Sequence, residues 1–425
     1  MSRLITGRWS GSHYPDLARR DRRSCEYHAY LPDRLVGKEF RFLGPVAADL
    51  TEAESEILLL NEQASALQDT EAIARLLLRA ESVASSYIEG LEVGGRRLLR
   101  AEAMREMGER TSDVTAAEVL GNVAAMRFAV EDLTSAESLT VDGLLEVHRR
   151  LLEGTHLERF GGTLRQEQNW IGGSVFNPCS AAFVPPPPEY VDELLQDLVD
   201  FCNDDSLPAV AQAAIAHAQF ETIHPFVDGN GRTGRALIHA LLKRRGIARR
   251  VLPPVSLVLA TWAPQYVDAL MGTRYVGEPE SDEAIEGLNR WVEIFAAACR
   301  RSVADARTFE KRIVEIQASW RQALGKVRRG SAADLLIGAL PGAPILTVKG
   351  AAALIHRSFP QSNEAIERLE SGGVLRQTSV GRRNRAFEAP DVITAFTELE
   401  RRLASPEGDT RSSEPSRPVP YQPSP

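Results

Sequence analysis

One short segment, His224 to Arg235, brings together the residue types that phosphate chemistry needs. The imidazole of His224 can accept a proton near neutral pH, and the carboxylate of Asp228 can bind a hard cation. Arg232 and Arg235 are three positions apart, so they share one face of a helix and can each donate paired hydrogen bonds to phosphate oxygens. Two cations suit a polyphosphate better than a single phosphate. The segment therefore predicts a polyphosphate site.

The apolar pattern on either side places this segment between two helices. Residues 209–223 are alanine-rich, with large apolar residues at helical spacing, and a proline follows closely, so His224 should lie at a helix end. The apolar pattern resumes at Ala236, so a second helix should begin at about Asn230 or Gly231. The unpaired N–H groups of its first turn would face the glycine turn and attract an anion.

The segment resembles the signature of the Fic (Doc-like) family, His-Pro-Phe-x-Asp/Glu-Gly-Asn-Gly-Arg-x-x-Arg, and matches every fixed position. The resemblance implies transfer of AMP from ATP, with Mg2+, to a hydroxyl side chain of a target protein. It makes His224 the general base and Asp228 the metal ligand. The nucleotide phosphates would be held by Gly229, Asn230, Gly231, Arg232, Gly234 and Arg235.

The resemblance also places the adenosine end of ATP against a helix over residues 266–274. Relatives often have two adjacent tyrosines where this chain has Tyr266 and Val267. Because of this departure, the selectivity for the base stays open. Val267 and Leu270 are the candidates for contact with the base.

A second motif lies near the end of a helix predicted over residues 70–90. Ser85 and Glu89 are four positions apart and share a helix face, and Gly90 suits the end of a helix. Taken alone, such a pair is common at a solvated helix edge. The run also resembles the Ser-x-x-x-Glu-Gly inhibitory motif of Fic proteins. That resemblance implies a chain that carries its own inhibitor, with Glu89 paired to Arg235.

Residues 161–173 form a short stretch bounded by glycines, which predicts a strand and turn that return at residues 182–184. The stretch resembles the Fic flap, a β-hairpin beside the active site with which family members hold the target by edge-strand pairing. An ordinary surface hairpin is the alternative.

The C-terminal part has the pattern of a separate domain. Helices are predicted over residues 348–356 and 362–371, followed by a basic hairpin at residues 381–385. This order resembles a winged helix-turn-helix. Residues 345–388 hold seven basic and four acidic side chains, which keeps DNA binding open. Three glutamates on the presumed recognition helix, Glu364, Glu367 and Glu370, would repel phosphates. Protein contact or support of a homodimer is therefore favoured over DNA binding.

The expected fold class is mainly α: a Fic helical core with a β-hairpin flap, and a small C-terminal winged helix-turn-helix domain. Five regions follow from the patterns: an N-terminal arm and helical region (1–110), a Fic catalytic core (111–303), a connecting helix and linker (304–344), a winged-helix domain (345–395) and a tail (405–425). The tail is rich in serine, proline and charge, which predicts disorder.

Composition limits the class of protein further. The 425 residues are 43% hydrophobic, which is enough to form several hydrophobic cores. The net charge of −8 argues against a general affinity for nucleic acid. No apolar run approaches the ~18 residues of a membrane span, and the first residues lack an apolar signal core. The four cysteines, Cys25, Cys179, Cys202 and Cys299, form no close pair, which indicates reduced thiols and a cytoplasmic protein.

Three functions stay in competition after this step. The first is an autoinhibited protein adenylyltransferase. The second is a DNA-binding transcriptional regulator whose Fic fold senses nucleotide. The third is a Fic enzyme with altered chemistry, either transfer of another nucleotide or phosphoryl group or removal of AMP from a modified target.

Overall fold

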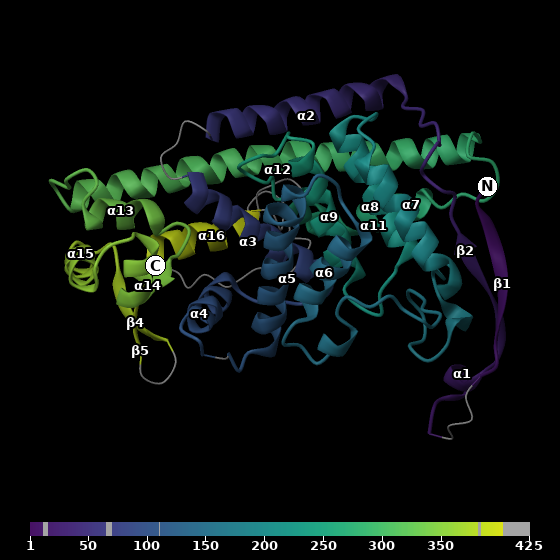
Figure 1. The fold of residues 1–425 in the computed structure, drawn as a ribbon, viewed down its shortest axis with the longest axis horizontal. Helices are drawn as coiled ribbons and strands as arrows, with labels where there is room; N and C mark the ends of the chain where they lie inside the picture. The colour runs from purple at the N-terminus through teal and green to yellow at the C-terminus, as the bar shows by residue number, and fades with distance from the viewer. Residues whose placement is uncertain (12–15, 65–69, 110, 381–383, 403–425) are drawn as a thin grey trace. The chain divides into compact units, whose positions relative to one another are not determined.

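The computed structural model describes residues 1–11, 16–64, 70–109, 111–380 and 384–402, and it is mainly helical (Figure 1). The chain forms two compact units that interleave along the sequence. The first unit consists of residues 1–54, 128–245 and 264–297, and the second of residues 55–127, 246–263 and 298–425. Among the helices described, none is both long and apolar enough to span a membrane.

The first unit is built around two helices, α8 (Ala209–Ile223) and α9 (Asn230–Arg244), which pack against each other. Every residue of α8 is buried, because its many alanines let neighbouring helices approach on all sides. Helix α7 (Val191–Asn203) packs on α8, and α6 (Val141–Leu152) packs on α9. Short 3-10 turns complete this unit: η1 (Leu133–Ser135), η2 (Glu158–Phe160), η3 (Pro178–Ser180) and η4 (Pro188–Tyr190).

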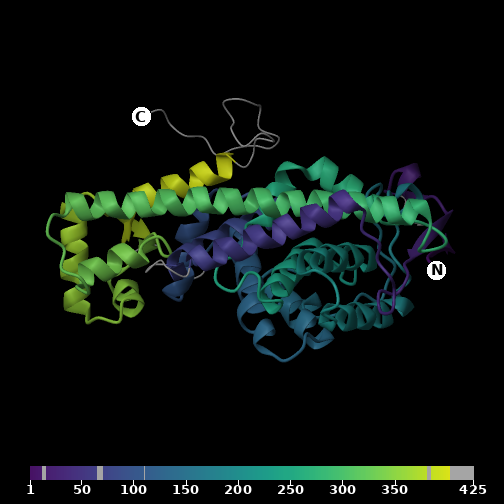
Figure 2. The same cartoon turned by 90° about the horizontal axis from the view of Figure 1, so that it is seen from above.

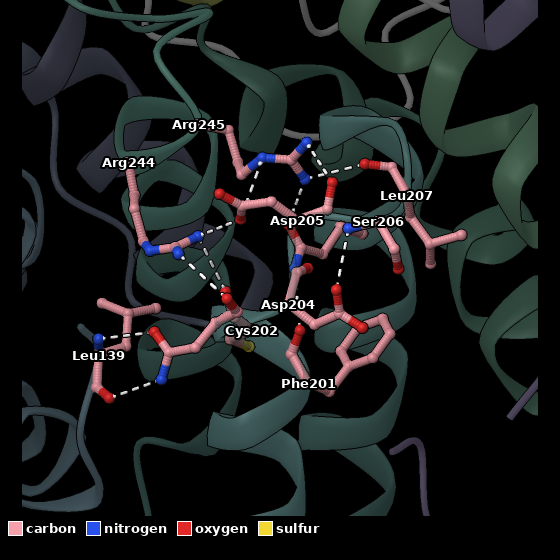
Figure 3. A network of polar contacts seen from close by, with 11 residues as sticks. Leu139, Phe201, Cys202, Asp204, Asp205, Ser206, Leu207, Arg244 and Arg245 are labelled. Carbon is pink, nitrogen blue, oxygen red and sulfur yellow. Dashed lines mark hydrogen bonds and ion pairs between the residues drawn. The ribbon is translucent and has the colours of Figure 1, made fainter. Parts of the chain in front are cut away.

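Two arginines fix the C-terminal end of α9 to the loop between α7 and α8 (Figure 3). Arg244 donates to the backbone oxygen of Cys202 at 3.1 Å and to the carboxylate of Asp205 at 2.7 Å. Arg245 donates to the backbone oxygen of Leu207 at 2.9 Å. Cations also suit the negative end of a helix dipole. The end of the α8–α9 pair far from the glycine turn is thus held rigidly.

The N-terminal arm contains a strand pair that the sequence analysis did not predict. Strand β1 (Arg3–Trp9) pairs antiparallel with β2 (Cys25–Leu31), and Trp9 lies opposite Cys25. The strands are joined through a chain segment that includes α1 (Arg19–Arg22). Their burial alternates only weakly, so period-two patterning gave little signal.

The prediction of four reduced cysteines is wrong for two of them. Cys25, at the start of β2, forms a disulfide with Cys179 in η3, while Cys202 and Cys299 are free and buried. The partners are 154 residues apart, so spacing in the sequence could not reveal the pair. This removes the cysteine argument for a reducing compartment.

The predicted flap is less regular than expected. Its two arms meet in one isolated antiparallel bridge between Ile171 and Phe183, and the rest of residues 161–173 is not a strand. Gly162, Gly172 and Gly173 all have positive φ, which interrupts an extended backbone. The expected hairpin is therefore correct only at that bridge.

In the second unit, α3 (Thr70–Ile88) packs against α10 (Val255–Thr261). Buried Glu81 of α3 accepts the N–H of Ser256 at 2.8 Å, and Asn122 donates to the hydroxyl of Ser86 at 3.0 Å. The sequence analysis missed α10 and also α4 (Gly95–Glu106). Helices α2 (Gly44–Ala64), α5 (Val114–Glu131) and α11 (Ala263–Gly272) have residues in both units.

Helix α12 (Asp282–Ala323) is a single helix of 42 residues (Figure 2), so the connecting helix expected from residue 304 is the second part of a longer helix. No glycine or proline interrupts the junction, and Ser302 and Val303 are both fully buried. The helix continues because the pattern contains no stop signal. Gly325, with φ of +67°, follows its end.

The C-terminal elements follow the predicted order. They are α13 (Ala332–Ala339), β3 (Ile345–Leu346), α14 (Val348–Leu354), α15 (Phe359–Ser371), β4 (Arg376–Val380), β5 (Asn384–Glu388) and α16 (Pro390–Arg402). The three strands form a sheet in the order β3-β5-β4. The two predicted helices and the hairpin strands are present, α16 was not predicted, and the winged-helix assignment stays a prediction. Residues 381–383 of the basic hairpin and the tail 405–425 lie outside the described residues.

Candidate functional site

The site predicted from the sequence lies in the first unit, in the loop between α8 and α9. Helix α8 ends at Ile223, and His224 takes a left-handed conformation with φ of 50° and ψ of 60°. Its N–H still donates to the backbone oxygen of Phe220 at 2.9 Å. Helix α9 begins at Asn230 after Gly229, which has φ of 80°. A left-handed non-glycine residue costs about 1–2 kcal/mol, so the surrounding structure must hold His224 in place.

Asn230 closes this loop. Its side-chain oxygen accepts the N–H of Phe226 at 2.8 Å, and its side-chain nitrogen donates to the backbone oxygen of Phe226 at 2.9 Å. The residue is 3% exposed. The side chain of Asn230 therefore holds the loop through Phe226. A contact of Asn230 with phosphate would use its backbone N–H and the second proton of its side-chain amide.

Asp228 lies at the outer side of the turn. Its side chain is 46% exposed, and one carboxylate oxygen accepts from Arg232 at 3.3 Å and from the N–H of Gly229. Among the residues that the structure describes, no three or more His, Cys, Asp or Glu side chains form a group that could hold a metal ion. A magnesium ion bound mainly through substrate phosphates and one carboxylate needs no such group, so Asp228 fits the predicted role.

His148, on α6, is a site residue that the sequence analysis did not nominate. Its ring stacks on Phe226 with centroids 3.6 Å apart and an angle of 8°. Nδ1 accepts the N–H of Gly162 at 3.0 Å, so the proton lies on Nε2, which donates to the backbone oxygen of Asp228 at 2.9 Å. Burial lowers the pKa of His148 to about 4. The neutral ring therefore holds the backbone of the turn through its hydrogen bond to Asp228.

The two arginines of the signature are buried in the first turns of α9, with Arg232 5% and Arg235 1% exposed. Gly231 starts the helix beside them, within the first turn where backbone N–H groups lack intrahelical partners. Gly234 lies further along. A Cβ atom there would meet Glu221 Oε1 and the Phe220 ring at 3.0 Å, so Gly234 allows the close packing of α9 on α8.

The predicted adenine helix corresponds to α11. Val267 is 55% exposed on it, whereas Leu270 is 7% exposed, so the two candidates differ in accessibility. Tyr266 turns into the core, where its hydroxyl lies 2.7 Å from Nε2 of His217. His217 itself is fully buried in α8. Nearby, the guanidinium of Arg274 lies 3.6 Å from the centre of the Phe183 ring, a contact that the sequence analysis missed.

The predicted inhibitory motif lies in the second unit, at the C-terminal end of α3. Ser85 is fully buried, and Glu89 is exposed just beyond the helix. Leu91 N–H donates to the Ser86 oxygen and Gly90 N–H donates to the Tyr87 oxygen, which together form a Schellman cap. The helix end expected at Gly90 is therefore present, and the pairing of Glu89 with Arg235 stays a prediction.

Comparison with known families agrees with this geometry. Residues 138–242 match the model described as the Fic/DOC family, and residues 47–131 match that of the Fic/DOC family N-terminal region. Over these residues the chain matches models of the Fic/DOC family, as the signature indicated.

Two curated relatives are named protein adenylyltransferases. The chain is 40% identical over 154 residues to "Protein adenylyltransferase fic-1" of Caenorhabditis elegans, covering 35% of this chain and 27% of that protein. It is 37% identical over 140 residues to "Protein adenylyltransferase Fic" of Drosophila willistoni, covering 32% and 26%. The chain thus spans about a quarter of the length of these relatives.

A solved structure shows the same fold. A Fic family protein from Desulfovibrio desulfuricans G20 matches 83% of this chain and 98% of its own chain, with a TM-score of 0.50 and 22% sequence identity. The mainly helical Fic fold predicted from the sequence is therefore confirmed.

Proposed function

We propose that this chain transfers AMP from ATP to a hydroxyl side chain of a target protein. The observation that carries the proposal is the loop between α8 and α9. It presents His224 at the end of one helix, six residues before the start of the next, with Arg232 and Arg235 buried in the first two turns of that second helix. The relatives named protein adenylyltransferases share this part of the sequence.

In the proposed reaction, His224 removes the proton from the target hydroxyl as its oxygen attacks the α-phosphate of ATP, and pyrophosphate leaves. The backbone N–H groups in the first turn of α9 and the guanidinium groups of Arg232 and Arg235 stabilise the negative charge that develops on the phosphates. Asp228 would hold Mg2+, which neutralises phosphate charge when bound.

The experiment that tests this function uses ATP labelled at either the α- or the γ-phosphate. The chain is incubated with each label in the presence of Mg2+ and candidate target proteins, and modified residues are identified by mass spectrometry. AMP transfer places only the α-label on protein, at a gain in mass of one AMP. Transfer of the γ-label would establish a kinase instead. Loss of AMP from a target that already carries it would establish removal as the activity.

Regulation by the N-terminal motif is a further part of the proposal. Glu89 would pair with Arg235 and hold the γ-phosphate away from the position needed for in-line attack. The observation behind this part of the proposal is the Ser-x-x-x-Glu-Gly run itself, with Glu89 placed just beyond the capped end of α3.

For the C-terminal elements we propose protein contact or homodimer support. Several basic residues there are engaged internally. Arg376 donates to buried Glu388, which also accepts from Arg96 of α4, and Arg385 lies 3.8 Å from Glu370 on α15. These pairs reduce the positive charge available for DNA. A gel-shift assay at low salt with mixed DNA tests the alternative of a DNA-binding regulator, which requires retardation without AMP transfer.

A cytoplasmic location is also part of the proposal, although the Cys25–Cys179 disulfide stands against it. Its test is fractionation of the cells that make the protein, together with the state of Cys25 and Cys179 in protein that is trapped with a thiol-blocking reagent on lysis. A disulfide found in most of the trapped protein would favour an oxidising compartment.

A further inference from the structure

Arg165 caps the helix that ends at the proposed catalytic base. Its Nε donates to the backbone oxygen of His224 at 2.9 Å, and its Nη2 lies 3.3 Å from that of Ile223. Its own N–H donates to the backbone oxygen of Pro225 at 2.9 Å. The last carbonyls of a helix have no partners within the helix, and they carry the negative end of its dipole. Arg165 satisfies two of these oxygens with one cation.

The same guanidinium also binds the first arm of the flap segment and the chain just after its return arm, which ends at residue 184. Nη1 donates to the backbone oxygen of Glu167 at 3.2 Å, and Nη2 donates to that of Pro186 at 2.5 Å. Asn169 adds a second link, because its Nδ2 donates to the backbone oxygen of Phe226 at 3.2 Å. Two side chains of one segment therefore join the proposed target-holding arms to the loop of the proposed base.

A buried guanidinium destabilises the fold unless its N–H groups are hydrogen-bonded. Arg165 is 3% exposed, and burial lowers its pKa to about 10. The hydrogen bonds of its guanidinium all go to backbone oxygens, four in number. A buried cation is tolerated when its donors are satisfied in this way, and the planar fork of arginine can reach several oxygens that a lysine could not.

We propose that Arg165 is a positioning residue, which holds His224 in its left-handed conformation and sets the flap arms at a fixed place relative to the imidazole. The inference rests on the proposed function, since it assigns His224 as the base. A target hydroxyl held by the flap would then arrive at a constant distance from the base. A displacement of about 1 Å can cost on the order of a hundredfold in rate.

The test compares Arg165→Met and Arg165→Lys with the wild-type chain. A matched control is Arg149→Met, because Arg149 lies on α6, is half-exposed and pairs with Glu146 rather than with the loop. Hydrogen exchange followed by mass spectrometry is measured for residues 161–171 and 221–228, with residues 191–203 of α7 as a reference. Transfer of α-labelled AMP gives kcat and the KM for ATP.

We expect Arg165→Met to increase exchange at least about tenfold in the two segments and not in the reference. We also expect kcat to fall about a hundredfold, with the KM for ATP changed less than about threefold. Arg165→Lys keeps the charge and part of the hydrogen bonding, so its exchange and its kcat should lie between those of Arg165→Met and the wild type. Arg149→Met should match the wild type in both measurements.

Unchanged exchange in both segments of a folded Arg165→Met variant would overturn the proposal. Increased exchange with unchanged kcat would also overturn it. That result would mean that Arg165 stabilises the loop but that its loss does not move the base. If Arg165→Met does not fold, Arg165→Lys decides by the same criteria. A folded Glu89→Gly chain that transfers no AMP would refute the proposed function, and the exchange data would still decide whether Arg165 holds the loop.

Discussion

At the scale of single residues, the sequence shows the proposed base directly. It does not show the side chains that hold that base and its loop in place. His224 was predicted from its place in the signature, and the structure puts it at the helix end as expected. His148 and Arg165 were not nominated, because their contacts join residues 80 and 59 positions apart. A histidine on the apolar face of a helix gives the same pattern whether it fills a core or supports a turn. Only the three-dimensional contacts separate the two.

The roles of His224 and Asp228 can be separated by substitution. His224→Ala should abolish AMP transfer while leaving binding of Mg-ATP within a few-fold, because the imidazole acts on the incoming hydroxyl. Asp228→Ala should instead weaken the Mg2+-dependent part of nucleotide binding. Calorimetric titration of each variant with ATP, at several Mg2+ concentrations, measures both. Loss of ATP binding in His224→Ala would leave the assignment of the base unsupported.

His217 should make the fold sensitive to acid. Burial and the nearby charge of Arg235 lower its pKa from 6.5 to about 3 in the folded chain. The unfolded chain therefore binds a proton at a higher pH than the folded one, and stability falls as pH decreases from about 6.5 towards 3. In His217→Gln, the midpoint of urea unfolding should depend less on pH between 7 and 4. His148, whose pKa is lowered to about 4, keeps part of the dependence in that variant. An identical slope in variant and wild type would contradict the buried neutral state.

At the scale of elements, patterning predicted the helices with strong signals and missed those without. Helix α8 has the predicted bounds, and α9 begins at Asn230 as expected. Helix α10 is short, wholly buried and preceded by two prolines, so it offers neither a polar face nor a start signal. The two parts of α12 were separated in the sequence analysis because its surface pattern changes from core-facing to charged along its length. Propensity without packing could not show that the helix is continuous.

The link between β2 and the flap segment is an element-scale feature with a measurable effect. The Cys25–Cys179 disulfide closes a loop of 154 residues, and Asn177 adds hydrogen bonds to the backbone of Asp21 at 3.0 Å. Closing so long a loop stabilises a fold by about 2–5 kcal/mol. The Cys25→Ser variant should therefore unfold at a lower denaturant concentration than the wild type.

Thiol counting supplies the control for this prediction. The unfolded wild type without reductant should show two reactive thiols, Cys202 and Cys299. Adding a reductant should bring the wild-type unfolding midpoint towards that of Cys25→Ser and leave the variant unchanged. Four reactive thiols in protein purified without reductant would show that the disulfide does not form.

At the scale of the whole molecule, the predicted inhibitor and the predicted site belong to different units. The second unit holds α3, and within it buried Arg79 of α3 donates to Glu102 on α4 and to the backbone oxygen of Gly342. The helix with the inhibitory motif therefore contacts the turn between α13 and β3, within the C-terminal elements. No local sequence signal predicts this, because residues 79 and 342 meet only through the fold of the chain. A partner that binds the C-terminal elements would act on the same unit as the motif.

The effect of Glu89 is the strongest test at this scale. If Glu89 pairs with Arg235, the arginine cannot also bind the γ-phosphate, so ATP binds with its α-phosphate turned away from in-line attack. Glu89→Gly should then raise AMP transfer, including self-modification, at least about tenfold, without a comparable gain in ATP affinity, because the defect that it relieves is one of positioning. Glu92→Gly is the matched control, since Glu92 is also exposed and lies three residues further along, outside any helix. It should behave as the wild type, and the double variant Glu89→Gly with His224→Ala should be inactive. If folded Glu89→Gly transfers AMP at the wild-type rate to a target that other Fic enzymes accept, Ser85 to Gly90 is an ordinary capped helix end and the autoinhibition hypothesis fails.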